Sequence, residues 1–198
     1  MSARKVFLDV GAHRGQTLAA ALERDFDRIH CFEPVSQHSP ELERMADKKR
    51  TSVERFGLWN QTAAVDLFDP GTKGAGMWIK DKRRPHLPIT RELCQFRRAS
   101  DWFREHIAPG QAVYLKLNCE GCECDILDDL LDSGEFEKVS FAMVDFDVRK
   151  IAALKHRQAE TMERLAAYPA PRVMYSRAAM AGNTHRERIH HWLGMLPA

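Results

Sequence analysis

The stretch Leu8-Asp9-Val10-Gly11-Ala12-His13-Arg14-Gly15 joins a short apolar run, Val6–Val10, to a segment whose apolar residues recur at helical spacing, Thr17–Arg24. A buried strand that passes through a glycine-containing turn directly into a helix is the usual first unit of a parallel α/β sheet. Glycine at such a turn lets the backbone approach a ligand closely, and the helix that follows presents amide groups at its N-terminus. The stretch therefore predicts an α/β fold with a binding site for a nucleotide-type cofactor at its first turn.

Short apolar runs alternate with helical patterns along most of the chain. The predicted strands are Val6–Val10, Ile29–Phe32, Val53–Leu58, Ala112–Leu117, Val139–Val144 and Val173–Tyr175, and the predicted helices are Thr17–Arg24, Pro40–Lys49, Ala99–His106, Cys124–Leu131 and Arg149–Ala167. Parallel strands need crossover helices, so this order predicts a doubly wound, mostly parallel sheet that helices cover on both faces. We expect Ser100 to cap the helix that begins at Ala99.

The composition is that of an ordinary globular domain. Of the 198 residues, 44% are hydrophobic and 29% are charged, so we expect residues 1–198 to form a single domain. Thirty basic and 28 acidic residues leave a net charge of +2, which is too even for a dedicated nucleic-acid or membrane-surface protein. No run approaches the ~18 to 20 apolar residues of a membrane span, and the N-terminus has no signal-peptide pattern. We therefore expect a cytoplasmic protein with no specific nucleic-acid or membrane partner, and leave its oligomeric state open.

The region from Asp69 to Gln95 interrupts the alternation and is rich in glycine, proline and basic residues. Loops longer than ~15 residues inside compact domains are often lids over a site, so residues 69–95 are a candidate acceptor lid. A basic cluster within it, Lys80, Lys82, Arg83 and Arg84 with Trp78 nearby, would steer an anionic acceptor. A solvated basic loop is the simpler interpretation of the same residues.

The tail from Pro169 to Ala198 carries a second group of polar and basic residues: His185, Arg186, Arg188, His190 and His191. Such a group would bind a phosphate-bearing acceptor or a metal. Because polar and apolar residues alternate there, a surface strand or the edge of a helix is the favoured interpretation.

The spacing at the first turn selects among nucleotide cofactors. Dinucleotide sites favour Gly-x-Gly-x-x-Gly, whereas here Gly11 and Gly15 are separated by three residues and Asp9 stands just before the turn. That pattern suits a cofactor with an amino-acid end, because the carboxylate would orient an ammonium group while the turn amides take the cofactor's own carboxylate. Glu33 ends the second predicted strand, where a carboxylate accepts hydrogen bonds from ribose hydroxyls. Together these residues predict S-adenosylmethionine and disfavour a nicotinamide-dependent oxidoreductase.

A third segment, Lys116-Leu117-Asn118-Cys119-Glu120-Gly121-Cys122-Glu123, follows the predicted strand Ala112–Leu117. With Asp9-Val10-Gly11-Ala12-x-x-Gly15 and Phe32-Glu33-Pro34 it resembles the FkbM-type methyltransferases, whose third block typically reads Lys-Ile-Asp-Val-Glu-Gly-Ala-Glu. The similarity runs from about Val6 to Asp147, with Phe56–Asn60 as the third strand and Ser100–Phe103 as the segment ahead of the fourth. It implies a seven-stranded, Rossmann-like fold and S-adenosylmethionine-dependent O-methylation of a hydroxyl on a sugar, glycan or secondary metabolite. The cofactor residues it implies are Asp9, Gly11, Ala12, Gly15, Glu33, Pro34 and Asn118.

The chain departs from that family at informative positions. Asn118 stands where the family usually has aspartate, His13 where it has asparagine, and cysteines fill two positions that small apolar residues usually hold. Asparagine keeps an acceptor oxygen but cannot take a proton, so Glu120 is the candidate base that removes the acceptor's proton, with Asn118 beside it at the transfer site.

Other interpretations of these residues remain open. Glu120 would instead make a tight turn and bond the start of the next helix, while Glu123 would cap or solvate that helix. The asparagine at position 118 also suits a degenerate S-adenosylmethionine-binding module that acts through a partner.

Three of the five cysteines crowd at Cys119, Cys122 and Cys124. A disulfide within so short a segment is strained, so reduced thiols are expected. Two thiolates at this spacing also occur in zinc and iron–sulfur sites, but no second pair is present to complete one. We therefore predict no metal and treat the thiols as small buried side chains.

Overall fold

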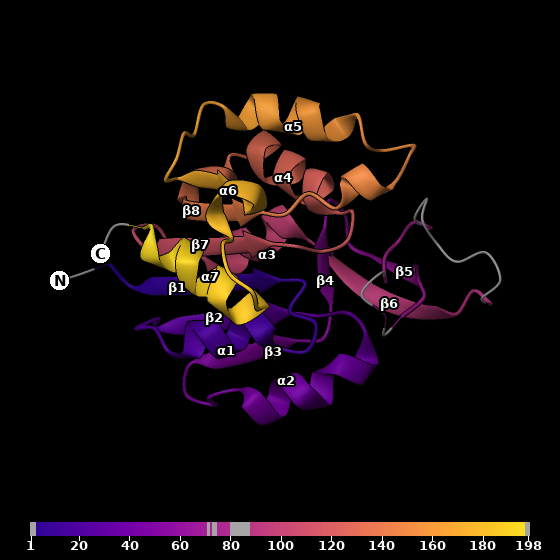
Figure 1. The fold of residues 1–198 in the computed structure, drawn as a ribbon, viewed down its shortest axis with the longest axis horizontal. Helices are drawn as coiled ribbons and strands as arrows, with labels where there is room; N and C mark the ends of the chain where they lie inside the picture. The colour runs from indigo at the N-terminus through magenta and orange to yellow at the C-terminus, as the bar shows by residue number, and fades with distance from the viewer. Residues whose placement is uncertain (1–2, 71, 73–74, 80–87, 197–198) are drawn as a thin grey trace.

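The computed structural model describes residues 3–70, 72, 75–79 and 88–196. Six strands form the main sheet in the order β3-β2-β1-β7-β8-β9, and every neighbouring pair is parallel (Figure 1). They are β1 Lys5–Val10, β2 Arg28–Phe32, β3 Thr51–Glu54, β7 Ala112–Leu117, β8 Val139–Val144 and β9 Val173–Tyr175. The doubly wound α/β fold predicted from the sequence is confirmed, with six strands rather than seven in the described part of this sheet.

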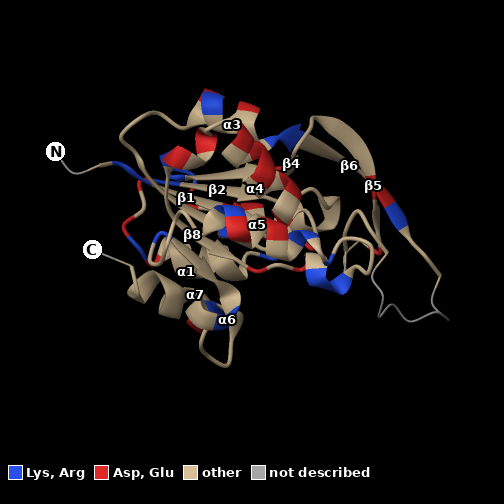
Figure 2. Cartoon of the chain, turned by 90° about the horizontal axis from the view of Figure 1, so that it is seen from above, with Lys and Arg blue, Asp and Glu red and all other residues tan. Residues whose placement is uncertain are grey.

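Helices cover both faces of the sheet (Figure 2), with α3 and α4 on one side and α1, α6 and α7 on the other. The helices are α1 Gln16–Leu22, α2 Ser39–Met45, α3 Ala99–His106, α4 Glu123–Asp132, α5 Arg157–Leu165, α6 Ser176–Ala179 and α7 His185–Gly194, with 3₁₀ turns at Ser36–His38, Glu135–Lys138 and Val148–Lys150. Acidic residues of α4 lie beside basic residues of α5, where Arg157 pairs with Asp125 and Asp128.

The alternation of side chains along the central strands puts two charges inside the molecule. Leu8 of β1 packs into the core on the α3 and α4 side, whereas Phe7 packs into the core beneath α1 and α7. Asp9 points to the same face as Phe7, because side chains two residues apart share a face. Its register partner on β7 is Lys116, and the Lys116 Nζ lies 2.9 Å from the Asp9 Oδ1. Asp9 and Lys116 are 0% and 2% exposed, so each charge depends on the other.

A second, three-stranded sheet has the order β4-β6-β5 and forms the arm at the right of Figure 1. Its strands are β4 Gly57–Trp59, β5 Ala63–Phe68 and β6 Arg91–Arg98. The predicted strand Val53–Leu58 is therefore wrong as one unit, because its first half joins the main sheet and its second half joins this one. The predicted loop 69–95 is also wrong at its C-terminal end, where residues from Arg91 pair antiparallel with β5. The basic cluster Lys80, Lys82, Arg83 and Arg84 lies outside the described residues.

Two helix predictions need correction. The expected helix Arg149–Ala167 is shortened to α5, because the chain turns at Val148–Lys150 and is extended at Ile151. Ser100 is not the cap of α3, which begins after an extended Arg98. Asp129 of α4 caps this helix instead, accepting the Ser100 amide at 2.7 Å and the Arg98 Nε at 2.6 Å.

The C-terminal tail folds onto the main sheet. Thr184 and Glu187 form a capping box at the start of α7, and α7 packs along α1 (Figure 1). Ile189 and Trp192 are fully buried in that contact layer. None of the helices in the described part of the chain is long and apolar enough to cross a membrane.

The Asp9–Lys116 pair gives a stability prediction. Lys116→Met leaves the Asp9 carboxylate buried without a cation, and we expect it to lower the free energy of unfolding by about 3–5 kcal/mol. Asp9→Leu combined with Lys116→Met removes both charges and should recover most of that loss, because two apolar side chains carry no desolvation penalty. Urea unfolding of the three proteins measures both effects. Equal losses in the single and double variants would mean that the isolated charge is not the cause.

Candidate functional site

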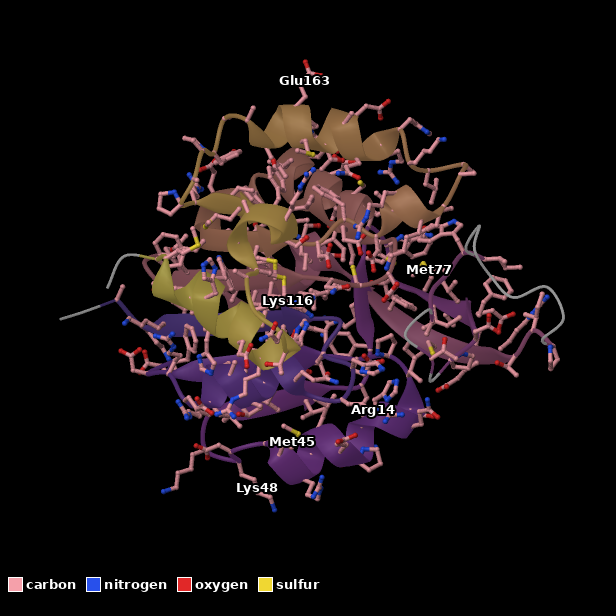
Figure 3. All side chains as sticks on the ribbon, in the orientation of Figure 1. Arg14, Met45, Lys48, Met77, Lys116 and Glu163 are labelled. Atoms are coloured by element: carbon pink, nitrogen blue, oxygen red, sulfur yellow. The ribbon has the colours of Figure 1, made fainter. Side chains whose placement is uncertain are left out.

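A cavity of about 440 Å³ opens beside the carboxyl ends of β1, β2 and β7. Strands β2 and β3 extend the sheet on one side of β1, and β7, β8 and β9 extend it on the other, so the strand order reverses between β1 and β7. Ligands of open α/β sheets bind at such a reversal. In Figure 3 Lys116 lies near the middle of the molecule, and Met77, another lining residue, lies toward the β5–β6 arm.

Most of the residues predicted for the site surround this cavity. The lining includes Gly11, Ala12, Glu33, Pro34, Asn118 and Glu120. Asp9 and Gly15 are not part of the lining. Asp9 lies beneath the turn and holds the Lys116 ammonium, rather than being open to a ligand's ammonium group.

The two glycines of the first turn are required by the chain's own packing. Gly11 has φ +82°, and a Cβ there would lie 1.9 Å from the Asn118 carbonyl oxygen. Gly15 also has φ +82°, and a Cβ there would lie 2.9 Å from the Met45 Sδ on α2. At these two glycines the sequence predicted that a ligand approaches the backbone closely. The groups that approach it are instead the chain's own: the residue after β7 at Gly11 and α2 at Gly15. Lys116 fastens the same turn, because its Nζ donates to the Gly11 carbonyl at 2.8 Å and to the Val10 carbonyl at 3.3 Å.

The amides of the first turn already have acceptors. Gly11 and Ala12 both donate to the Phe32 carbonyl at 3.1 Å, and His13 donates to the Glu33 Oε2 at 2.8 Å. The Gly15 amide donates to the Ala12 carbonyl at 2.9 Å. These four amides are not available for a carboxylate, which corrects the role expected of them from the sequence.

Glu33 reaches the cavity from the end of β2. Its Oε2 accepts the His13 amide, and its Oε1 accepts the Val35 amide at 2.9 Å. Burial raises the pKa of Glu33 to about 7, although these two hydrogen bonds oppose the shift. Each carboxylate oxygen retains a second lone pair, so Glu33 can accept further hydrogen bonds from a ligand.

Two histidines contact each other in the cavity wall. The ring centroids of His13 and His38 are 4.2 Å apart. Burial lowers the pKa of both rings, that of His38 to about 4, so both are neutral near pH 7. The Nε2 of each is buried and has no hydrogen-bond partner among the described residues. The sequence singled out His13 only as a departure from the family and missed His38, whose one signal is its place shortly after Glu33.

The turn between β7 and α4 is strained and is held by a buried acid. Glu120 has φ +61°, a left-handed conformation that costs energy for a residue with a side chain. The Glu123 Oε1 accepts the amides of Cys119 and Gly121, both at 3.1 Å, which fixes this conformation. Glu123, rather than Glu120, therefore bonds the turn, and burial raises the pKa of Glu123 to about 7. The Glu120 Oε2 lies 3.6 Å from the Lys150 Nζ.

Asn118 and the neighbouring cysteines complete this side of the cavity. The Asn118 Nδ2 donates to the Asp145 Oδ2 at 3.4 Å, so an aspartate at position 118 would face a second carboxylate. All five cysteines are free. A hydrogen bond with Cys122, together with burial, raises the pKa of Cys119 well above its usual range. In the described ranges no group of three or more His, Cys, Asp or Glu side chains is arranged to hold a metal ion.

The C-terminal segment also contributes to the cavity, which the sequence did not predict. Asn183, His185 and Arg188 line it, and the His185 Nε2 lies 3.0 Å from the Thr17 Oγ1 on α1. The other basic residues of the tail lie elsewhere: Arg186 and His190 pair with Glu23, and His191 bonds the Ala179 carbonyl. The capping box at Thr184 was the available signal that a helix starts here.

No family model matches the sequence, and no curated protein matches it. The fold is similar to the crystal structure of the methyltransferase FkbM from Methylobacillus flagellatus KT, with a TM-score of 0.42 and 19% sequence identity. The match covers 66% of this chain and 30% of that one, so the chain spans less than a third of that protein's length.

The buried acids predict how stability depends on pH. Folding raises the pKa of Glu33 and Glu123 from 4.5 to about 7, so the folded state holds protons that the unfolded state has released between these values. Stability present below pH 4.5 is therefore lost as the pH rises through 7, by about 3 kcal/mol for each group. Glu123→Gln cannot ionise and should remove its share of this loss between pH 5 and pH 8. Chemical denaturation at several pH values measures it, with the exposed Glu163→Gln on α5 as control. A Glu123→Gln profile parallel to that of the unmodified protein would contradict the assignment.

Proposed function

We propose that this protein is an S-adenosylmethionine-dependent methyltransferase that methylates a hydroxyl group of a small molecule or glycan. The observation that carries the proposal is the convergence of three sequence motifs on one cavity: Gly11 and Ala12 from the first, Glu33 and Pro34 from the second, and Asn118 and Glu120 from the third. The cavity lies at the reversal of strand order, where α/β sheets bind nucleotides.

The residues present fit the adenosine part of such a cofactor. Glu33 has lone pairs left for the ribose hydroxyls, and Leu58 and Phe96 provide an apolar wall for the adenine ring. The unpartnered Nε2 atoms of His13 and His38 are suited to uncharged polar atoms of the nucleoside, because both rings are neutral. A volume of about 440 Å³ is within the range of ordinary ligand pockets. When bound, the cofactor supplies an electrophilic methyl group.

Glu120 is the side chain we assign to proton removal. It lines the cavity in a strained conformation that Glu123 maintains, and such strain is concentrated at functional sites. The Lys150 Nζ lies 3.6 Å from the Glu120 Oε2 and 2.7 Å from the Asp147 Oδ2, so the side chain of Glu120 has a cation beside it. Asn118 lies in the same wall and positions the acceptor through its amide, since it cannot accept a proton.

Cofactor binding gives the first test. Glu33→Ala should weaken the binding of S-adenosylhomocysteine by about tenfold to hundredfold at pH 8, because hydrogen bonds to a charged group are lost. Binding to the unmodified protein should strengthen between pH 6 and pH 8, as Glu33 ionises through its pKa of about 7, and Glu33→Gln should lose this dependence. Isothermal titration calorimetry measures both, after thermal unfolding has shown that the variants fold. Unchanged affinity in Glu33→Ala would remove Glu33 from the site.

Methyl transfer gives the second test. Glu120→Gln should lower transfer from labelled S-adenosylmethionine to a panel of hydroxyl acceptors by about 10²–10⁴-fold, the usual contribution of a general base, while cofactor affinity is retained. Glu163→Gln is the matched control on the exposed face of α5. Equal turnover in Glu120→Gln would show that another group takes the proton. A protein that binds the cofactor but methylates no member of the panel would favour the alternative of a binding module.

A further inference from the structure

We infer that Arg188 of the C-terminal helix holds the carboxylate at the amino-acid end of the methyl donor. This inference rests on the proposed function and adds a binding residue from a part of the chain that the motifs do not reach, since their resemblance ends near Asp147.

The first turn leaves a donor carboxylate without a partner. The amides of Gly11, Ala12 and His13 are used by Phe32 and Glu33. Lys116 lines the cavity, but an ammonium group has three hydrogens, and three acceptors surround its Nζ: the Asp9 carboxylate and the carbonyls of Val10 and Gly11. These amides and the Lys116 ammonium therefore already have acceptors within the protein, so they are not available to bind the donor's carboxylate.

Arg188 is a cation of the cavity lining without a carboxylate partner in the described part of the chain. Its Nε donates to the Gly182 carbonyl at 3.1 Å, and no hydrogen bond of its two Nη groups to a described residue is found. Arg186 on the same helix pairs with Glu23 and does not line the cavity. A guanidinium group binds a carboxylate through two parallel hydrogen bonds, which gives it both strength and orientation.

The fold fixes the place of Arg188, an exposed residue, in the wall of the cavity that the first turn also lines. The capping box of Thr184 and Glu187 sets where α7 begins, and buried Ile189 and Trp192 hold the helix against the α1 layer. His185, one helical turn before Arg188, contacts Thr17 of α1 at 3.0 Å. Burial lowers the pKa of the His185 ring, so Arg188 rather than His185 supplies the positive charge.

The position favours the donor's carboxylate over an anionic acceptor. Glu33 takes the ribose on the β2 side, so the amino-acid end extends toward β1 and β7. His185 lies on that side, because its Nε2 is 3.0 Å from the Oγ1 of Thr17 on α1, the helix that follows β1. Of the two permanently charged cations in the described lining, Lys116 is paired with Asp9, and no ion pair with a described residue is found for Arg188, so a ligand carboxylate would supply its counterion.

The test compares two ligands that differ in the amino-acid end. Arg188→Met should weaken binding of S-adenosylhomocysteine by about tenfold to hundredfold and change binding of 5′-methylthioadenosine, which has no carboxylate, by less than about threefold. Arg188→Lys keeps the charge and should recover part of the loss. Arg186→Met is the matched control on the same helix and should bind both ligands as the unmodified protein does. Calorimetry supplies the dissociation constants.

Each other outcome overturns the inference in a recognisable way. Equal losses for the two ligands would mean that Arg188→Met disturbs the whole cavity. Unchanged binding of S-adenosylhomocysteine would assign Arg188 to an anionic acceptor or to the surface. Failure of the unmodified protein to bind either ligand would overturn the proposed function itself, which distinguishes that failure from an error about Arg188 alone.

Discussion

The buried ion pair between Asp9 and Lys116 joins the two strands at which the sheet reverses its order. Lys116 also donates to the carbonyls of Val10 and Gly11, so one side chain of β7 fixes the turn that follows β1. This turn places the His13 amide where it donates to Glu33. The end of β7 leads directly to Asn118 and Glu120. A buried ion pair contributes little net stability compared with two apolar residues, but it penalises every register in which the charges separate. The geometry of the cavity therefore depends on a buried pair of which Lys116 reaches the lining and Asp9 does not.

Burial determines which groups around the cavity carry charge. It keeps His13, His38 and His185 neutral near pH 7 and raises the pKa of Glu33 to about 7. Lys116 is balanced by Asp9, and Glu120 lies beside Lys150. This leaves Arg188 as the lining cation that no described carboxylate neutralises. A ligand with hydroxyl groups, an aromatic base and one carboxylate matches this distribution, whereas a polyphosphate would meet too few cations.

The sequence predicts the parallel sheet well because strands buried on both faces are continuous apolar runs. It fails at β6, whose exposed face carries Arg91 and Leu93 and whose buried face begins only at Cys94, so the alternation is weak. The same limit applies to the site. That Gly11 and Glu33 belong to a cavity follows from their places after strands, but the contacts that require each glycine, the Asn118 carbonyl and Met45, come from distant parts of the chain. Pairing of Asp9 with Lys116 likewise depends on strand register, which no local pattern specifies.

The C-terminal helix shows why the resemblance to a family does not define the whole site. The motifs end near Asp147, yet α7 brings Asn183, His185 and Arg188 to the same cavity. Its position rests on apolar contacts of Ile189 and Trp192 beneath the helix and on the contact of His185 with Thr17. A ligand that touches both Arg188 and the first turn binds only when α7 is in place. Binding and the packing of α7 on α1 are therefore linked equilibria, and each must strengthen the other by the same free energy.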